Sequence, residues 1–331
     1  MDVVLDFERP VVELRKRISQ LRELQDSDGV DLSASIAQLE VQAVRLEERI
    51  FGGLTPWQRT LLARHPSRPY TLDYVEHLFY EWTELHGDRA GYDDHAIVCG
   101  IARLQPTGEE DDPTADCPVV VIGHQKGRNT KQNLFRNFGM ARPDGYRKAL
   151  RIMKLAERFG LPIVTFIDTP GAYPGIDAEA RGQAEAIAKN IMEMARLEVP
   201  VVAVVIGEGG SGGALAIGVA NRVIMLENSV YSVISPEGCA AILWRDRAEG
   251  PRAAQALRIT AEDCRELGVS DRVVEEPAGG AHRNPEVAMD AVGAAIRSSL
   301  TELRGLGTDA LAAHRYDRFR AMGRMIDPDA A

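Results

Sequence analysis

The sequence has few cysteines, few aromatic residues and no excess of basic residues. Its 331 residues include 4 cysteines and 6% aromatic residues, and its net charge is −10. We do not expect such a chain to bind mainly a nucleic acid backbone, because proteins that do so usually present a basic surface. The cysteines lie far apart with no C-x-x-C pair, so they predict neither a zinc site nor a disulfide framework. They are Cys99, Cys117, Cys239 and Cys264.

Long apolar stretches are also absent. No run approaches the roughly 20 apolar residues that a membrane-spanning helix needs, and the first residues lack the basic stretch and apolar core of a signal peptide. We therefore expect a cytoplasmic protein that does not contact a membrane. With 45% hydrophobic residues, the chain can form a substantial buried core.

The first quarter of the chain has the pattern of helices. Apolar residues recur at three-to-four-residue spacing around a polar break, SDGVDLS, which predicts a helical hairpin over about 11–50. Thr55-Pro56 and Thr71 are start signals for two more helices, each with a threonine cap. We expect a helical N-terminal region at 1–85, a core domain at 86–300 and a helical tail at 301–331.

In the expected core, short apolar runs alternate with glycine-rich turns and amphipathic helices. Helices are expected at 143–159 and 180–197, and a polar, proline-broken loop at 105–118. This alternation predicts an α/β fold whose strands are buried on both faces. The expected strands are IVCGIARL, VVVIGH, IVTFID, VVAVVIG and RVIMLE.

One glycine-rich stretch, VVAVVIGEGGSGGALAIGV at 201–219, resembles a dinucleotide-binding fingerprint. Gly207, Gly209 and Gly212 fit G-x-G-x-x-G after a strand and before a helix. That fingerprint belongs to the first βαβ unit of its domain, whereas at least three expected strands precede this one. The match is therefore a minor alternative.

The same stretch has two further chemical interpretations. Ser211 stands in G-x-S-x-G, and Asp271 and His282 follow in the order that a serine hydrolase requires. Alternatively, glycines at a helix start leave amide N–H groups open, and these groups favour an oxygen that becomes negative during a reaction. A tight turn that serves only close packing is the remaining alternative.

Two more special turns follow expected strands. One is IDTPGAYPG at 167–175, and the other is the SPEG that begins a helix in SVISPEGCAAILW. DTPG matches the D-x-x-G of GTPases, but the sequence has no G-x-x-x-x-G-K-[ST], so a phosphate cradle is missing. Ligands of α/β sheets bind outside the carboxyl ends of the strands, so these turns predict a ligand site there.

The segment at 124–148 is basic within an acidic chain. It holds seven lysines and arginines against one acidic residue, Asp144. It predicts either a solvated basic face or a site for phosphates or an acidic partner, with Lys126, Arg128 and Lys131 as candidates. His124, like His282, is more often a structural histidine than a ligand or a base.

Taken together, these motifs closely resemble the carboxyltransferase α subunit of bacterial multi-subunit acetyl-CoA carboxylase. The resemblance extends from LDFERP to about residue 320, with the family's carboxyltransferase domain at about 40–300. It implies a crotonase-like (ClpP/crotonase) spiral of ββα units with a helical N-terminal region, rather than a plain doubly wound sheet. The segments that carry it are HQKGRNTK, RNFGMARPDGYRKALRIMKLAERFGLPIVTFIDTPGAYPG, ARGQAEAIAKN, VPVVAVVIGEGGSGGALAIGV, YSVISPEGCAAILW and EPAGGAHRNP.

The resemblance implies an activity and partners. The chain is expected to be the α half of an enzyme that moves a carboxyl group from N1-carboxybiotin to acetyl-CoA, giving malonyl-CoA for fatty acid synthesis. The biotin is expected on the biotin carboxyl carrier protein and not on this chain, which is expected to hold no metal. A zinc-containing β subunit is expected in an α2β2 heterotetramer, with biotin carboxylase in the wider ATP-dependent complex. The chain alone is expected to be inactive.

The resemblance also implies site residues. The peptide amides of Gly212 and Gly213 are expected to hold the biotin oxyanion, and biotin's own nitrogen is the implied base. Loss of one such donor typically costs about 10²- to 10³-fold in rate. A Gly213→Val variant is expected to assemble, to melt near wild type and to lose at least ~10²-fold in kcat. Further substrate-binding candidates are Gly209, Gly210, Gly171, Ala172, Lys126, Arg128 and Lys131.

Overall fold

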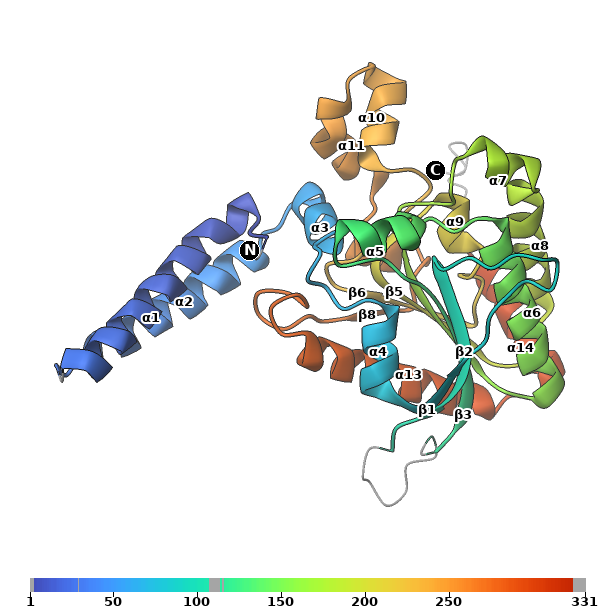
Figure 1. Cartoon of the computed structure of the whole chain (residues 1–331), viewed down its shortest axis with the longest axis horizontal. Helices are drawn as coiled ribbons and strands as arrows, with labels where there is room; N and C mark the ends of the chain where they lie inside the picture. The colour runs from blue at the N-terminus through green and yellow to red at the C-terminus, as the bar shows by residue number, and fades with distance from the viewer. Residues whose placement is uncertain (1–2, 29, 107–113, 115, 324–331) are drawn as a thin grey trace, which may run out of the picture.

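The computed structural model describes residues 3–28, 30–106, 114 and 116–323. A helical hairpin extends away from a larger body in which helices surround a sheet (Figure 1). The α-helices are α1 (Arg9–Asp28), α2 (Ser33–Phe51), α3 (Pro56–Ala63), α4 (Thr71–Leu78), α5 (Thr130–Phe135), α6 (Pro143–Phe159), α7 (Ile176–Ala180), α8 (Gln183–Arg196), α9 (Ser211–Leu215), α10 (Pro236–Trp244), α11 (Gly250–Leu257), α12 (Ala261–Glu266), α13 (Pro285–Arg304) and α14 (Thr308–Arg320). Short 3-10 helices are η1 (Asp6–Glu8), η2 (Asn137–Gly139) and η3 (Arg247–Glu249).

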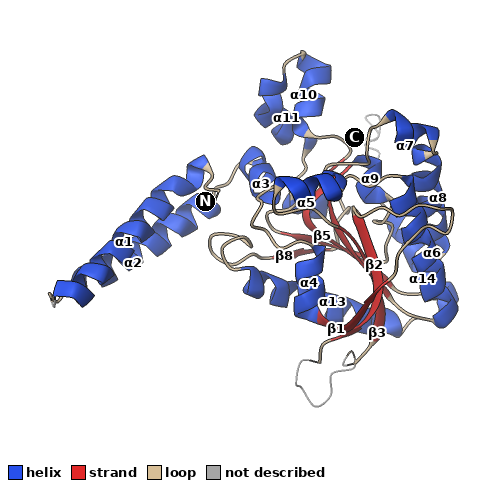
Figure 2. Ribbon diagram, in the orientation of Figure 1, coloured by secondary structure: helices blue, strands red, loops and turns tan. Residues whose placement is uncertain are grey.

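The sheet runs through the centre of the body (Figure 2). Its strand order is β1-β2-β3-β4-β5-β6-β8, and β7 pairs with the end of β5. The first three strands are antiparallel neighbours, whereas β3, β4, β5, β6 and β8 are parallel. The strands are β1 (Phe79–Glu84), β2 (Ile97–Leu104), β3 (Pro118–His124), β4 (Ile163–Thr169), β5 (Val201–Gly210), β6 (Arg222–Leu226), β7 (Val230–Ser232) and β8 (Arg272–Val274).

Helices bury the central strands on both faces. Val201 and Ala203 of β5 belong to the apolar cluster that includes α6 and α8, whereas Val202 and Val204 belong to the cluster that includes α4 and α13. Successive side chains of a strand point to opposite faces, so a strand covered on both sides reads as a continuous apolar run. This packing fixes the carboxyl ends of β3, β4 and β5 relative to one another.

The hairpin of α1 and α2 has a small core of its own. Ile18, Ile36 and Ala43 are buried between the two helices, apart from both clusters of the sheet. Its base is attached to the body by the buried Glu8, whose carboxylate accepts a hydrogen bond from His282 and pairs with Arg283. The helical hairpin expected at about 11–50 is confirmed.

Most expected elements of the core are present, but several boundaries differ. The segment at 79–84 is strand β1, so the expectation of a wholly helical region at 1–85 was wrong. The helix expected at 180–197 begins at Gln183, because Gly182 adopts a left-handed φ of 83° that separates α7 from α8. Tyr70 rather than Thr71 precedes α4, and the Thr71 hydroxyl donates to the His124 carbonyl.

The remaining expected boundaries fall on continuous structure or outside the described residues. Helix α13 runs through the boundary expected at residue 300. The loop expected at 105–118 joins the antiparallel strands β2 and β3, as a hairpin does, but residues 107–113 and 115 lie outside the described part, as do 324–331 of the expected tail. Among the described residues, no helix is long and apolar enough to cross a membrane.

Candidate functional site

The end of β4 with the turn after it, and the end of β5 with the start of α9, lie against each other at the carboxyl edge of the sheet. We name residues 168–172 the first glycine turn and residues 207–213 the second glycine turn. A Cβ atom at Gly210 would lie 2.2 Å from the Pro170 carbonyl oxygen, and one at Gly213 would lie 2.5 Å from the Ala172 nitrogen. The backbones can approach this closely only because both positions lack a side chain.

Short-range contacts hold each turn in shape. In the first glycine turn, the Thr169 hydroxyl donates to the Gly171 carbonyl (2.7 Å) and accepts from the Gly171 amide (3.1 Å). In the second, Ser211 has a positive φ of 54° and begins α9. Gly210 caps this helix without a side-chain hydrogen bond, so the amides of its first turn have no intrahelical partner.

A mostly apolar groove of about 390 Å³ borders the second glycine turn. Ser211, Gly212 and Leu215 are among the residues that line it. Its apolar lining also includes Tyr231, Val233, Leu257, Val269 and Phe319. Amide donors beside an apolar groove can hold a neutral heterocycle by its carbonyl oxygen, and can stabilise that oxygen as it becomes negative.

Gly212 and Gly213 differ in their surroundings. A Cβ atom at Gly212 would meet only the Ile187 side chain, at an ordinary 3.5 Å. Gly213 is buried against the first glycine turn, where a Cβ atom would lie 2.6 Å from the Gly171 carbonyl carbon and 3.0 Å from the Tyr146 hydroxyl. The expectation that Gly213→Val melts near wild type was therefore wrong, since the valine would collide with backbone.

The serine hydrolase alternative fails on geometry. His282 donates to the Glu8 carboxylate (2.8 Å) and its ring packs at a tilt against His65, and it does not line the groove. Asp271 accepts from Arg318 and from the Val223 amide. Within the described residues, neither group contacts Ser211, so no triad forms.

The dinucleotide fingerprint is also out of place. Gly207 and Gly209 lie within β5 itself and Gly212 lies in α9, and β5 comes after four earlier strands of the chain. The fingerprint's glycines instead follow the first strand of a βαβ unit. We therefore do not assign a dinucleotide-binding site to these glycines.

The three basic candidates have different environments. The Lys126 ammonium is enclosed, 2.7 Å from Asp168 Oδ1 and 3.0 Å from Glu208 Oε1. Arg128 donates to the carbonyls of Pro66 and Arg68 and pairs with Asp73. Lys131, in α5, is exposed. Phosphate binding stays a prediction, and Arg128 and Lys131 are exposed whereas Lys126 is largely enclosed.

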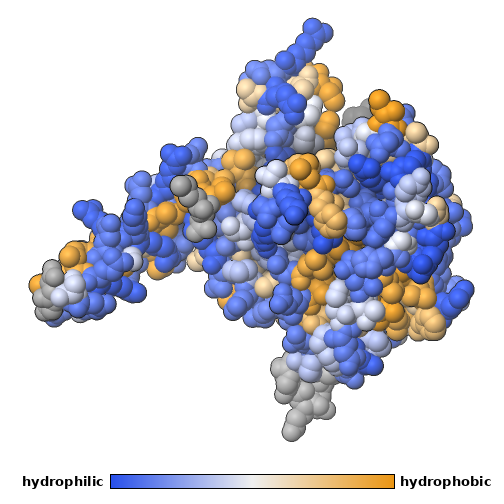
Figure 3. Space-filling view, viewed as in Figure 1, coloured by the Kyte–Doolittle hydropathy of each residue, from blue (hydrophilic) through white to orange (hydrophobic). Residues whose placement is uncertain are grey.

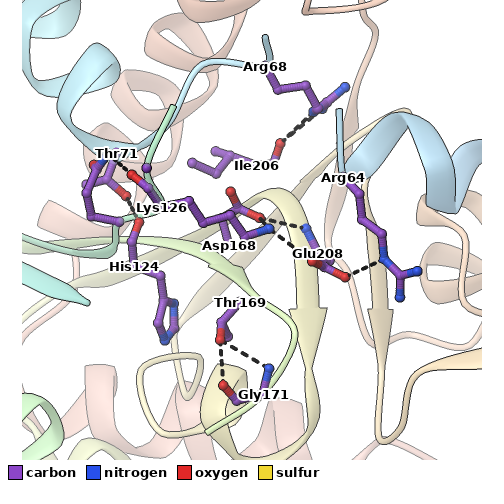
Figure 4. A network of polar contacts seen from close by, with 12 residues as sticks. Arg64, Arg68, Thr71, His124, Lys126, Asp168, Thr169, Gly171, Ile206 and Glu208 are labelled. Carbon is purple, nitrogen blue, oxygen red and sulfur yellow. Dashed lines mark hydrogen bonds and ion pairs between the residues drawn. The ribbon is translucent and has the colours of Figure 1, made fainter. Parts of the chain in front are cut away.

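A network of ion pairs joins the two glycine turns (Figure 4). Glu208 bridges Lys126 through Oε1 and Arg64 through Oε2 (2.8 Å), and Arg64 continues to Glu237 (2.6 Å). Burial raises the pKa of Asp168. Burial would also raise the pKa of Glu208, but the nearby Lys126 and Arg64 hold it below its usual range.

The sequence interpretation missed the acidic members of this network. Asp168, Glu208 and Glu237 each stand in one of the three special turns: DTPG, GEGG and SPEG. The presence of one acidic residue in each of the three turns was the available signal. The ion pairs join residues up to 173 positions apart in the sequence. The sequence alone therefore does not predict which charged side chains meet.

His124 ends β3 directly behind the site. Its ring is fully buried near the backbone of Gly213 and Phe166, and neither ring nitrogen has a hydrogen-bond partner among the described residues. Burial, helped by the Lys126 charge, lowers the pKa of His124 to about 3. The neutral ring is consistent with a structural histidine.

Glu8, His65 and His282 bring their possible ligand atoms within 4.8 Å of one another, and none of the three belongs to the glycine turns. His282 donates to Glu8, and His65 Nε2 contacts the Val3 carbonyl (3.0 Å). The cluster therefore has the contacts of a hydrogen-bonded anchor for the N-terminal segment.

Comparison with known structures identifies the fold. The structure resembles transcarboxylase 12S with methylmalonyl-coenzyme A and methylmalonic acid bound, at a TM-score of 0.56 and 20% identity, covering 72% of this chain and 42% of that chain. The expected crotonase-like architecture is thereby confirmed. Helices α1 to α4 form the expected helical N-terminal region, which ends where β1 begins.

Sequence comparison identifies the family. The chain is 57% identical to the acetyl-coenzyme A carboxylase carboxyl transferase subunit alpha of Syntrophotalea carbinolica, over 97% of this chain and 98% of that protein. It is 56% identical to the protein of that name from Thermus thermophilus, over 98% and 99%. A family model described as acetyl co-enzyme A carboxylase carboxyltransferase-like matches residues 4–323. The chain therefore belongs to the family of acetyl-coenzyme A carboxylase carboxyltransferase α subunits.

Proposed function

We propose that this chain is the α half of a carboxyltransferase that carries a carboxyl group from carboxybiotin to acetyl-CoA, giving malonyl-CoA. The near full-length similarity to α subunits of that enzyme supports the reaction class. The finer proposal is that the biotin is attached to a carrier protein, and that a zinc-containing β subunit completes an α2β2 enzyme. Biotin carboxylase would recharge the carrier in the wider complex. A cytoplasmic location stays a prediction.

One observation carries the proposal: uncapped amides at the start of α9 border an apolar groove. Carboxybiotin supplies an activated carboxyl group on a ureido ring, whose oxygen becomes more negative when that group leaves. An apolar groove suits the bicyclic ring, and peptide amides suit the oxygen. We assign the Gly212 amide as the primary donor to that oxygen, with Gly213 adding its amide or holding the turn against Ala172.

The roles of the remaining glycines follow from their contacts. Gly210 and Gly171 allow the two glycine turns to touch, and Gly209 pairs with Thr169 across β4 and β5. These residues fix the donors before the substrate arrives, and such fixed donors lose no energy to reorganisation during the reaction. No side-chain nucleophile is part of the proposal.

Exposed apolar side chains near the site support a protein partner that covers it. Figure 3 shows apolar surface over α5 and α7 among hydrophilic residues. Patches of this kind mark interaction sites on proteins that are otherwise polar outside. We propose that they receive the β subunit, which would bring acetyl-CoA to the groove. The exposed apolar side chains include Leu134 and Phe135 of α5, Ile176 of α7, Val233 directly after β7, and Ile242 and Leu243 of α10.

Co-purification with the β subunit, followed by an exchange assay, tests the function. The purified complex should decarboxylate malonyl-CoA in the presence of biocytin, a soluble biotin derivative, whereas this chain alone should not. Ser211→Ala should keep most of this activity. Loss of hydrolysis of an activated ester in Ser211→Ala, together with no exchange by wild type, would support the hydrolase alternative instead.

A further inference from the structure

The ion-pair network that joins the two glycine turns has no role in the chemistry proposed so far. Its members do not line the apolar groove, so they do not contact a ligand bound there. Yet Lys126 and Asp168 are almost completely buried, with 12% and 3% of their side chains exposed. Burial of charges is costly unless the geometry of the pairing compensates. A cluster of buried charges beside the site therefore needs a functional or structural explanation.

The network connects the two glycine turns through one ammonium group. Asp168 is the first residue of the first glycine turn, and Glu208 is the second residue of the second. Lys126 contacts both carboxylates, and Asp168 Oδ1 also accepts a hydrogen bond from the Glu208 amide (3.1 Å). The Asp168 carboxylate fills the space beside Gly207, where a Cβ atom would lie 2.4 Å from Oδ1. The ion pairs of Lys126 with Asp168 and Glu208 therefore set the distance between the two glycine turns.

The third special turn joins the same network from the other side. Glu237 lies in the first turn of α10, whose cap is the Ser235 hydroxyl, and it binds both terminal nitrogens of Arg64 (2.6 and 3.3 Å). The other carboxylate oxygen of Glu208 binds Arg64 Nε. Three turns from different parts of the chain are therefore held by two cations.

We propose that Lys126 is a positioning residue that fixes the separation of the two glycine turns, and so aims the amide donors at the substrate oxygen. Gly213 touches Gly171 and Ala172 directly, so a shift between the turns moves the start of α9. Catalytic donors tolerate little error, since a misplacement of about 1 Å can cost about 10²-fold in rate. This inference rests on the proposed function.

A positioning role predicts effects that a purely structural role does not. In complexes that have assembled with the β subunit, Lys126→Met should lower kcat for the malonyl-CoA and biocytin exchange by at least about 10-fold. KM for malonyl-CoA should change less than about threefold. Lys126→Arg keeps the charge but moves it, and should fold well while losing kcat by a similar factor.

Lys148 offers a matched control. It is a second buried lysine, 2.6 Å from Asp93 Oδ1 and 2.7 Å from the Asp94 carbonyl, and it contacts neither glycine turn. Lys148→Met should lower the melting temperature, as Lys126→Met does, but leave kcat per assembled complex within about threefold of wild type.

The outcomes separate this inference from the proposed function. Normal kcat in assembled Lys126→Met complexes would overturn the positioning role. If Lys126→Met does not assemble, normal kcat in Lys126→Arg would overturn it, and a reduced kcat with unchanged melting would support it. An equal loss of kcat in Lys148→Met would also overturn it. No exchange by the wild-type complex would instead overturn the proposed function, and this inference with it.

Discussion

At the scale of single residues, the neighbouring glycines Gly212 and Gly213 have different surroundings. Gly212 borders the groove and has room for a methyl group, whereas Gly213 has none. The sequence alone treated the two as equivalent, because nothing in GGSGG distinguishes a glycine that faces a ligand from one that faces backbone. The structure makes the two positions separately testable.

Gly213→Ala should destabilise the chain because its Cβ atom would lie within 2.6 Å of two backbone atoms of the first glycine turn. Overpacking of this kind typically costs about 1–3 kcal/mol. Gly212→Ala, the matched variant one position earlier, should cost much less. Urea unfolding of both variants checks this, and equal stabilities would contradict the packing described for Gly213.

His124 should make stability dependent on pH. Its folded pKa of about 3 lies below the reference value of 6.5, so the unfolded state binds the proton first. The stability due to this group is complete above pH 6.5 and is lost as pH falls from 6.5 toward 3. Between pH 7 and pH 5 the expected loss is about 2 kcal/mol.

His124→Gln provides the comparison, since glutamine does not titrate. The free energy of unfolding should fall with acid by about 2 kcal/mol more in wild type than in the variant. Parallel pH profiles would show that His124 takes up its proton equally in both states.

At the scale of elements, the sequence predicted regular segments well and irregular ones poorly. Strand β2 and helix α6 match their expected ranges, 97–104 and 143–159, because a clear apolar run or an amphipathic stripe ended at turn residues. Strand β1 was missed because FYEWTE follows α4 directly, without a glycine or proline between them. A glycine turn was expected after VVAVVIG, but β5 continues to Gly210, so Gly207 and Gly209 lie in the strand. The network that joins the two glycine turns was not predicted, because it depends on side chains from β4, β5, α10 and the segments that follow α3 and β3.

The hairpin of α1 and α2 should unfold locally without the sheet. Ile36 is buried in a cluster that shares no residue with the two clusters of the sheet. Ile36→Ala should cost about 2–5 kcal/mol, confined to the hairpin. Hydrogen exchange should accelerate in α1 and α2 and stay slow in β4 and β5. Faster exchange throughout the sheet would show that the hairpin and body unfold together.

At the scale of the whole molecule, the proposed function requires a partner subunit. The groove and its amide donors lie at one end of the sheet, and apolar side chains are exposed nearby on α7 and α10. Ile176 is 86% exposed and Ile242 is 72% exposed. We therefore propose α7 and α10 as part of the surface that the partner covers.

Charged substitutions on this surface should weaken assembly and leave the fold intact. Ile176→Asp and Ile242→Asp should each reduce affinity for the β subunit by at least about 10-fold if these side chains are interface anchors. Melting of the isolated chain should stay near wild type. Tyr316→Asp, an exposed position on α14, is the control and should not change affinity. Unchanged affinity in both isoleucine variants would place the interface elsewhere.

The central claim is that a backbone amide of the second glycine turn, rather than a side chain, stabilises the substrate oxygen as it becomes negative. Two substitutions at Gly212 test it most directly, because alanine keeps the amide N–H and proline removes it. Proline is tolerated in the first turn of a helix, and Gly212 is the second residue of α9. Melting temperatures and assembly with the β subunit would verify that both variants fold.

The decisive measurement is kcat for the malonyl-CoA and biocytin exchange in the two assembled complexes. The account predicts that Gly212→Pro is slower than Gly212→Ala by about 10²- to 10³-fold, the effect of one lost oxyanion donor. An assembled Gly212→Pro complex that turns over as fast as Gly212→Ala would contradict it.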